Sequence, residues 1–411
     1  MTTDDLTLTV TGMAHGGDAV ARHEGKAVFI PGAMSWETVR VTLVDERERF
    51  SRARLLEVLA PSQERVAPRC PHFGTCGGCQ WQYMGYPAQL REKREIVRSL
   101  LERTGGQTEP DVREVVGMAE PWGYRNHVQL RRDDQGRIGY YAAKSHDVVP
   151  VDHCPLVHPL LDEMWGALDI DLPELQQIVL RAGLASGEQM LILQGRDEPP
   201  ELSLELPISC LWQGQEGQVS VLAGDDCIHE RLGSLQFRVS GPSFFQVNSE
   251  QAEVLIDVAR RALALKPGER LLDAYCGVGA FMLSLGQEAS QVIGIESSPW
   301  ALDDAAVNAQ AVDWRGDVAL YEGDVAEVLS EQPMPCDAIV VDPPRSGLSR
   351  EALESLVACG ASRWVYVACD PASLARDVKR LAQAGYRLAH VQPVDLFPQT
   401  YHIESVALLV R

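Results

Sequence analysis

A cysteine at the end of an apolar run is the residue of this sequence best suited to covalent chemistry. Residues 364–368 read WVYVA, Cys369 follows, and Asp370 and Pro371 open an amphipathic stretch. This pattern predicts a buried parallel strand that ends in a turn and a helix, which places Cys369 at the sheet edge where open α/β folds bind ligands. The helix dipole should favour the thiolate, which is the attacking form, while Asp370 opposes it. The alternative is a buried structural cysteine.

A glycine-rich turn predicts a nucleotide-like ligand at the same edge. The segment LLDAYCGVGAF places Asp273, Gly277 and Gly279 between a strand and a helix, and Glu296 ends the next predicted strand. The glycines let the backbone approach a ligand closely, and a carboxylate in the position of Glu296 accepts hydrogen bonds from ribose hydroxyls. The pattern D-x-x-x-G-x-G resembles the first motif of S-adenosylmethionine (SAM)-dependent methyltransferases. We therefore predict SAM as the ligand and expect Asp324, after the third strand, to face its adenine.

An acidic residue before two prolines follows the fourth predicted strand. In VVDPPRSGL, Asp342 should reach the same sheet edge, with the prolines stiffening the turn behind it. In methyltransferases this position faces the methyl donor and the target group. The alternative is a simple turn, and the motif alone would suggest methylation of an amino group.

A cluster of cysteines near the N-terminal third predicts a metal centre. Cys70, Cys76 and Cys79 lie in CPHFGTCGGCQWQ, with glycines that let several sulfurs converge on one point. Cys154, which precedes a proline, is the candidate fourth ligand. Four thiolates fit either zinc or an iron–sulfur cluster, and the spacing is not that of radical SAM enzymes.

The elements that must position these residues divide the chain into three parts. Residues 1–62 contain several short strands and predict a small β-barrel, and residues 63–238 predict a β-rich domain with the cysteine site. A helix at 86–103 belongs to this second part and could pack on the catalytic domain. Residues 239–411 alternate strands and helices, which is typical of a doubly wound, Rossmann-like sheet.

Charge and composition limit the partners and the compartment. The net charge is −21, but residues 1–145 carry 20 Lys and Arg against 19 Asp and Glu, so the acidic excess lies in the remainder of the chain. Any polyanion should therefore meet the N-terminal third and local basic patches. Ten cysteines and an acidic N-terminal stretch with no apolar signal core favour a reducing cytoplasm, and no apolar run approaches a membrane span.

Taken together, the motifs resemble the RNA uracil-5-methyltransferase family over essentially the whole chain. The similar segments are GPSFFQVN, DAYCGVG, DPPRSG, ACDPASLARD and DLFPQTYHIES, with the cysteine cluster and an N-terminal stretch similar to the TRAM domain, a barrel of the oligonucleotide-binding type. The resemblance implies Cys369 as the nucleophile and Glu404 as the general base. It also implies a SAM site formed by Gln246, Tyr275, Glu296 and Asp342, to which the sequence pattern adds Asp324. It further implies a 4Fe–4S cluster whose ligands would be Cys70, Cys76, Cys79 and Cys154. The family commonly has Cys-Asn-Pro where this chain has Asp370, a departure that should raise the thiol pKa.

The resemblance also frames the substrate and the competing interpretations. The three-part layout with a cysteine cluster is closer to ribosomal than to transfer RNA members, so we expect a monomer that acts on 23S ribosomal RNA, on a uridine in a loop or flipped out of a helix. An RNA cytosine-5-methyltransferase would carry a second cysteine in the fourth-strand motif. A non-catalytic iron–sulfur RNA-binding protein would not need both Cys369 and Glu404, and a small-molecule methyltransferase would leave the barrel unexplained.

Overall fold

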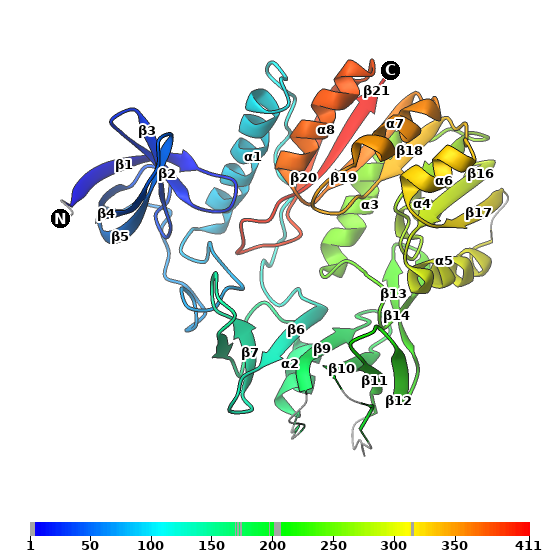
Figure 1. The fold of residues 1–411 in the computed structure, drawn as a ribbon, viewed down its shortest axis with the longest axis horizontal. Coiled ribbons are helices and arrows are strands. Elements are labelled where there is room, and N and C mark those ends of the chain that lie inside the picture. The colour runs from blue at the N-terminus through cyan, green and yellow to red at the C-terminus, as the bar shows by residue number, and fades with distance from the viewer. Residues whose placement is uncertain are drawn as a thin grey trace.

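The computed structural model describes residues 5–168, 170, 172, 175–196, 198–200, 207–313 and 316–411. Figure 1 shows three bodies: an N-terminal barrel, a central sheet and a larger α/β body. The predicted multidomain architecture is confirmed. None of the described helices has both the length and the apolar character needed to cross a bilayer.

The N-terminal body is a closed barrel with the strand order β1-β2-β3-β5-β4. Alternating side chains point inward, and Val10, Ile30 and Val39 are completely buried in its core. A small barrel leaves no free sheet edge, which suits a domain of this size. Its strands are β1 (Leu6–Met13), β2 (Ala19–His23), β3 (Lys26–Ile30), β4 (Thr38–Glu46) and β5 (Phe50–Ala60).

The central body is a mostly antiparallel sheet with the order β12-β11-β10-β9-β6-β7-β8. Helix α2 (Pro159–Gly166) covers one face of it through Leu161 and Met164. Its strands are β6 (His127–Arg132), β7 (Ile138–Tyr141), β8 (Val148–Pro150), β9 (Leu175–Ala182), β10 (Gln189–Gly195), β11 (Ser209–Gln213) and β12 (Val219–Ala223). A separate hairpin, β13 (Cys227–Leu232) and β14 (Leu235–Ser240), leads into the α/β body and packs against its helices.

The C-terminal body is a doubly wound sheet with the order β17-β16-β15-β18-β19-β21-β20. Strands β15 to β19 run parallel, and β21 is antiparallel to both of its neighbours. The strands are β15 (Arg270–Asp273), β16 (Gln291–Glu296), β17 (Asp317–Glu322), β18 (Ala338–Val341), β19 (Arg363–Ala368), β20 (Arg387–Val394) and β21 (Glu404–Val410). The helices are α3 (Ser249–Leu263), α4 (Ala280–Leu285), α5 (Pro299–Ala311), α6 (Val325–Glu331), α7 (Arg350–Ala358) and α8 (Pro371–Gln383). The reversal of strand order beside β15 opens the crevice in which such sheets bind ligands.

A segment from before the central sheet completes the α/β body. Helix α1 (Tyr86–Arg103) packs beside α8, and the chain that follows it runs parallel to the edge strand β20, with bridges from Val112 to Val391 and from Val116 to Val394. Side chains of α1, of α8 and of the sheet share one apolar core that includes Val97 and Leu101 of α1 and Leu374 of α8. Residues 86–118 are thus structurally part of the C-terminal body.

Candidate functional site

A cavity of about 550 Å³ opens at the carboxyl ends of the central parallel strands. It brings together most of the site residues predicted from the sequence, which come from well-separated parts of the chain. They are Gln246, Tyr275, Glu296, Asp342, Cys369 and Glu404.

The glycine-rich turn forms one wall of this cavity. Gly277 and Gly279 both have positive φ angles, of 52° and 90°, which side-chain-bearing residues rarely adopt. The amide of Gly277 donates to Glu296 Oε2 over 2.9 Å, and Ser298 donates to its other oxygen over 2.8 Å. Asp273 is buried behind the turn and accepts from the amide of Met282 over 3.0 Å, and its burial raises its pKa to about 8. The turn is therefore held open by carboxylates that bind its own backbone.

Asp324 is not among the described residues that line this cavity, but its charge acts on Tyr275, which does line it. Asp324 is the N-cap of α6 and accepts from the amides of Ala326 and Glu327. An aspartate that precedes a helix is commonly used in this way. The sequence pattern could not separate capping from ligand binding.

Cys369 lies between β19 and α8, and its thiol faces the cavity with partial exposure. Its pKa is raised to about 12 because the thiol is buried and because Glu404, Asp342 and Asp370 lie near it, while Arg345 opposes the shift. The expected stabilisation of a thiolate by the helix dipole is therefore outweighed. Asp370 contributes to this result, because its carboxylate already accepts from the first free amides of α8, those of Ala372 and Ser373.

Glu404 is the first residue of β21 and is almost fully buried. Within the described chain, no donor lies within hydrogen-bonding distance of its Oε1 atom. Burial and the neighbouring Asp342 raise its pKa well above the ordinary range, and Arg345 lowers it. Burial also raises the pKa of Asp342 to about 7. A buried carboxyl with an unused oxygen beside a cysteine is a candidate for proton transfer.

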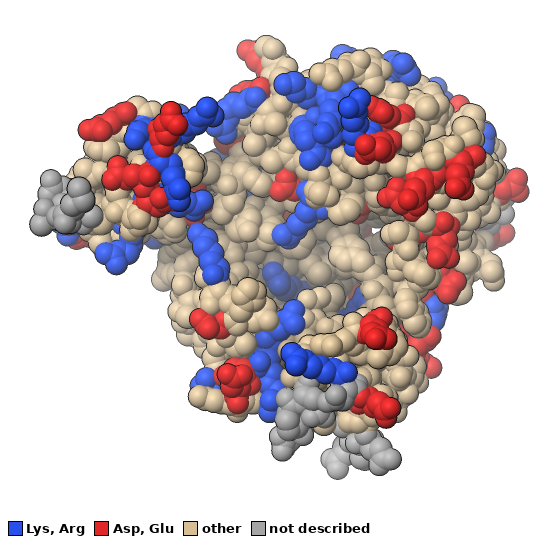
Figure 2. Space-filling model, viewed as in Figure 1, with Lys and Arg blue, Asp and Glu red and all other residues tan. Residues whose placement is uncertain are grey.

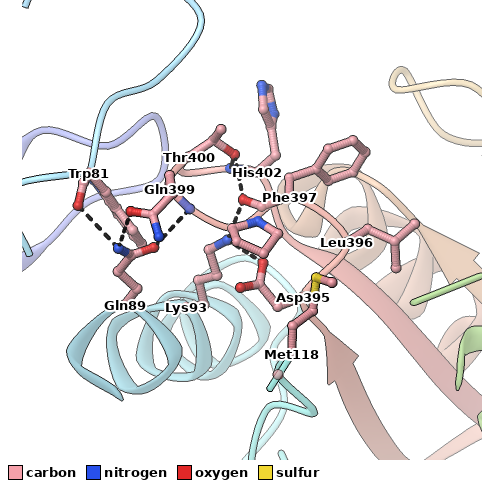
Figure 3. A network of polar contacts seen from close by, with 12 residues as sticks. Trp81, Gln89, Lys93, Met118, Asp395, Leu396, Phe397, Gln399, Thr400 and His402 are labelled. Atoms are coloured by element: carbon pink, nitrogen blue, oxygen red, sulfur yellow. Dashed lines mark hydrogen bonds and ion pairs between the residues drawn. The ribbon is translucent and has the colours of Figure 1, made fainter. Parts of the chain in front are cut away.

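Helix α1 anchors the loop that leads to Glu404, as Figure 3 shows. Lys93, completely buried, forms an ion pair of 2.6 Å with Asp395 and donates to the carbonyl of Phe397 over 3.1 Å. One turn away, Gln89 bonds both the side chain and the backbone amide of Gln399, which has a positive φ of 70°. These contacts fix the path of residues 395–402 between β20 and β21.

Among the cavity residues that the sequence analysis did not single out, Arg345 and Phe244 are the most informative. Arg345, in the DPPRSG turn, is the cation whose charge reaches both Cys369 and Glu404. Phe244 lines the same cavity with 68% of its surface exposed, which is unusual for a large apolar side chain. A charged residue directly after Asp-Pro-Pro was the available signal for Arg345, and the FF pair of GPSFFQVN was the signal for Phe244.

The four predicted metal ligands line one small cavity between the cysteine loop and the central sheet. Cys70, Cys76, Cys79 and Cys154 all face it, together with the half-buried Arg125. No described donor set of three or more such side chains is close enough to enclose a single metal ion. The convergence of four free thiols nevertheless fits a larger cluster, whose ligands surround several metal atoms, and the Nε atom of Arg125 has no described hydrogen-bond partner.

A second, larger cavity of about 700 Å³ lies between the barrel, the cysteine loop and the central sheet. Aromatic and basic side chains line it, including Tyr141, which stacks under Arg131 at 5.2 Å, and Lys144. Figure 2 shows Lys and Arg side chains at intervals along the hollow between the three bodies, while acidic side chains gather on the outer flank near α5 and α6. A hollow with this charge pattern suits a polyanionic strand despite the acidic total charge.

Comparison with known proteins agrees with this architecture. The TRAM domain description matches residues 4–56, the tRNA (Uracil-5-)-methyltransferase description matches residues 327–411, and that of RNA cap guanine-N2 methyltransferase matches residues 268–356. An uncharacterised RNA methyltransferase of Halalkalibacterium halodurans is 36% identical over 99% of this chain and 97% of its own length. One from Gloeobacter violaceus is also 36% identical, over 99% and 96%.

A solved structure shows the same fold. The tRNA (uracil-54, C5)-methyltransferase of Pyrococcus abyssi, in complex with S-adenosyl-L-homocysteine, superposes with a TM-score of 0.78 at 24% identity, over 98% of this chain and 100% of that one. The predictions of a SAM-dependent RNA methyltransferase with a TRAM domain are confirmed at this level. The chain belongs to the family of these RNA methyltransferases, and its C-terminal segment matches the tRNA (Uracil-5-)-methyltransferase description.

Proposed function

We propose that this protein methylates C5 of a uridine in RNA, with Cys369 as the nucleophile and Glu404 as the general base. One observation carries the proposal. The thiol of Cys369 and the buried carboxyl of Glu404, whose Oε1 has no partner among the described residues, line the same cavity as the glycine-rich turn. A methyl donor and a pyrimidine ring could thus both be held within reach of the two side chains.

The reaction explains why a cysteine and a carboxylate are needed together. Uracil C5 is a weak nucleophile, but attack of the Cys369 thiolate on C6 forms a carbon–sulfur bond and makes C5 electron-rich. SAM supplies an electrophilic methyl group on a positively charged sulfur, and C5 takes that group. Glu404 then removes the C5 proton, and the electron pair of the C–H bond expels the Cys369 thiolate and restores the ring.

The charges around Cys369 oppose a thiolate there. Burial, Glu404 and Asp342 raise the pKa of Cys369, and burial raises the pKa of both carboxyl groups. Arg345 opposes these shifts on Cys369 and Glu404, and a cationic ligand beside them would act in the same direction. We infer that Gln246, Tyr275, Glu296 and Asp342 contact the methyl donor, whereas the assignment of Asp324 rests on the sequence pattern alone.

The cysteine site is proposed to hold a 4Fe–4S cluster. Cys70, Cys76, Cys79 and Cys154 would be its ligands, and the cluster would join the loop before α1 to the central sheet. The guanidinium of Arg125 would balance part of the negative charge of the ligated thiolates.

We favour 23S ribosomal RNA as the substrate, modified in the cytoplasm by a monomer, because the chain combines a barrel, a cysteine cluster and a catalytic domain. Transfer RNA is the second candidate, supported by the transfer RNA enzyme of Pyrococcus abyssi, which has the same fold along the whole chain. Mapping of 5-methyluridine in both RNAs from cells that lack the gene decides between them. We expect one 5-methyluridine of 23S ribosomal RNA to be lost, and to be restored by the intact gene but not by Cys369→Ala. Loss of 5-methyluridine from transfer RNA instead would make transfer RNA the substrate.

A further inference from the structure

A loop of the barrel reaches the turn that carries Cys369. Figure 1 shows the connection between β1 and β2 extending from the barrel toward the loop between β20 and β21. The Nε2 atom of His15 in this connection lies 3.1 Å from Oδ2 of Asp370, the residue next to Cys369. This contact, which is an ion pair when His15 is protonated, joins a domain of the RNA-binding type to the start of α8.

The position of His15 is fixed by its neighbours rather than by the pair alone. The amide of Ala14 donates to the carbonyl of Asp18 over 2.8 Å, which closes a tight turn around His15. The carbonyl of Gly17 accepts from the indole of Trp81 over 3.1 Å, and a Cβ atom at Gly17 would lie only 2.9 Å from the Tyr401 ring. The loop is therefore packed on residues 395–402, the same segment that α1 anchors.

Asp370 uses its two oxygens for two different purposes. Oδ1 accepts from the amides of Ala372 and Ser373 over 2.9 and 2.8 Å and so caps α8, while Oδ2 meets His15. The negative charge of Asp370 acts unfavourably on a thiolate at Cys369, as do the charges of Glu404 and Asp342, whereas the charge of Arg345 is favourable. The field of Asp370 also reaches a second cation, Arg376.

We propose that His15 is a positioning residue of the methyl-transfer site: it holds the Asp370 carboxylate in its capping orientation and offsets the charge of that carboxylate beside the nucleophile. This inference rests on the proposed role of Cys369. It gives the barrel a part in the chemistry beyond RNA binding, because loss of this contact would leave the charge of Asp370 uncompensated beside the thiol.

The test is the rate at which iodoacetamide alkylates Cys369 in the intact protein without RNA, followed by mass spectrometry of the peptide that contains it. The thiolate displaces iodide, so the rate at fixed pH reports how much thiolate is present. We expect His15→Ala to lower this rate by about fivefold, the effect of one screened charge near the thiol. His23→Ala, in the same barrel at the end of β2, is the matched control and should leave the rate unchanged.

A double-mutant cycle separates the proposed role from a merely structural one. Asp370→Asn keeps an effective helix cap but removes the charge, so its alkylation rate should equal or exceed that of the unaltered protein, and adding His15→Ala should then change nothing. The proposal is overturned if His15→Ala is alkylated as fast as the unaltered protein. It is also overturned if His15→Ala lowers the alkylation rate by the same factor with Asp370 present and with Asp370→Asn. Because the measurement needs neither RNA nor SAM, it stands even if the proposed methyl transfer fails.

Discussion

Replacement of Lys93 by methionine tests whether the buried anchor of α1 governs the catalytic loop. Both Lys93 and Asp395 are fully buried, and burial lowers the pKa of Lys93 although Asp395 favours its charged form. Lys93→Met would leave the Asp395 carboxylate without its counter-ion, which costs about 3–5 kcal/mol in buried pairs. The carbonyl of Phe397 would lose a charged donor as well, at roughly 1 kcal/mol or more.

The assay is thermal unfolding together with turnover on RNA. We expect a fall of roughly 10 °C in the unfolding midpoint of Lys93→Met and a lower kcat, since the segment that leads to Glu404 loses its anchor. Lys379→Met, an exposed lysine on α8, is the matched control and should change stability by about 0.5 kcal/mol or less. Lys93→Met combined with Asp395→Leu should recover much of the loss, because no unpaired charge remains. If Lys93→Met unfolded at the same temperature as the control variant, the reasoning would be refuted.

Four further predictions concern the site and the central domain. SAM affinity should rise between about pH 6 and pH 8, because Asp342, with a pKa of about 7, binds a sulfonium better once it is ionised. For Asp342→Asn, calorimetry should show a SAM affinity that does not change over this pH range. Glu404→Gln should accumulate a covalent RNA adduct visible as a gel shift, since the C5 proton is no longer removed, and absence of the adduct counts against the assigned base. Anaerobically purified protein should contain about four irons per chain and lose them in Cys154→Ala, whereas stoichiometric zinc without iron would reject the cluster. Burial lowers the pKa of His127 to about 3, so the unfolded state binds a proton before the folded state does as the pH falls. The free energy of unfolding should therefore fall by roughly 1–2 kcal/mol between about pH 7 and pH 5. In urea titrations, His127→Gln should reduce this dependence of stability on pH.

Much of the fold could be read from local patterns. Apolar runs followed by glycine or proline turns predicted the parallel strands of the C-terminal sheet, and the run at residues 364–368 lies within β19 as expected. Short alternating strands likewise predicted the barrel, which closes as expected.

The parts that could not be predicted depend on contacts between distant segments. The path of the chain after α1 along β20, and the salt bridge from His15 to Asp370, follow from how three bodies pack, which no local pattern encodes. The sequence led us to expect that Asp370 raises the pKa of Cys369, but burial of the thiol and the charges of Glu404 and Asp342, which the fold brings in from elsewhere in the chain, contribute more to that rise. Cys369, a strand-end residue, could be placed at the sheet edge, but the balance of charges around it could not.

The central claim is that the sulfur of Cys369 bonds to C6 of a target uridine. RNA containing 5-fluorouridine tests it most directly, because the fluorine at C5 cannot be removed as a proton and the reaction should stop at the methylated adduct. We predict that mass spectrometry of the trapped complex locates the RNA on the peptide that contains Cys369, and that Cys369→Ala binds SAM but forms no adduct and transfers no methyl group. An adduct on another cysteine, or undiminished turnover by Cys369→Ala, would contradict the account.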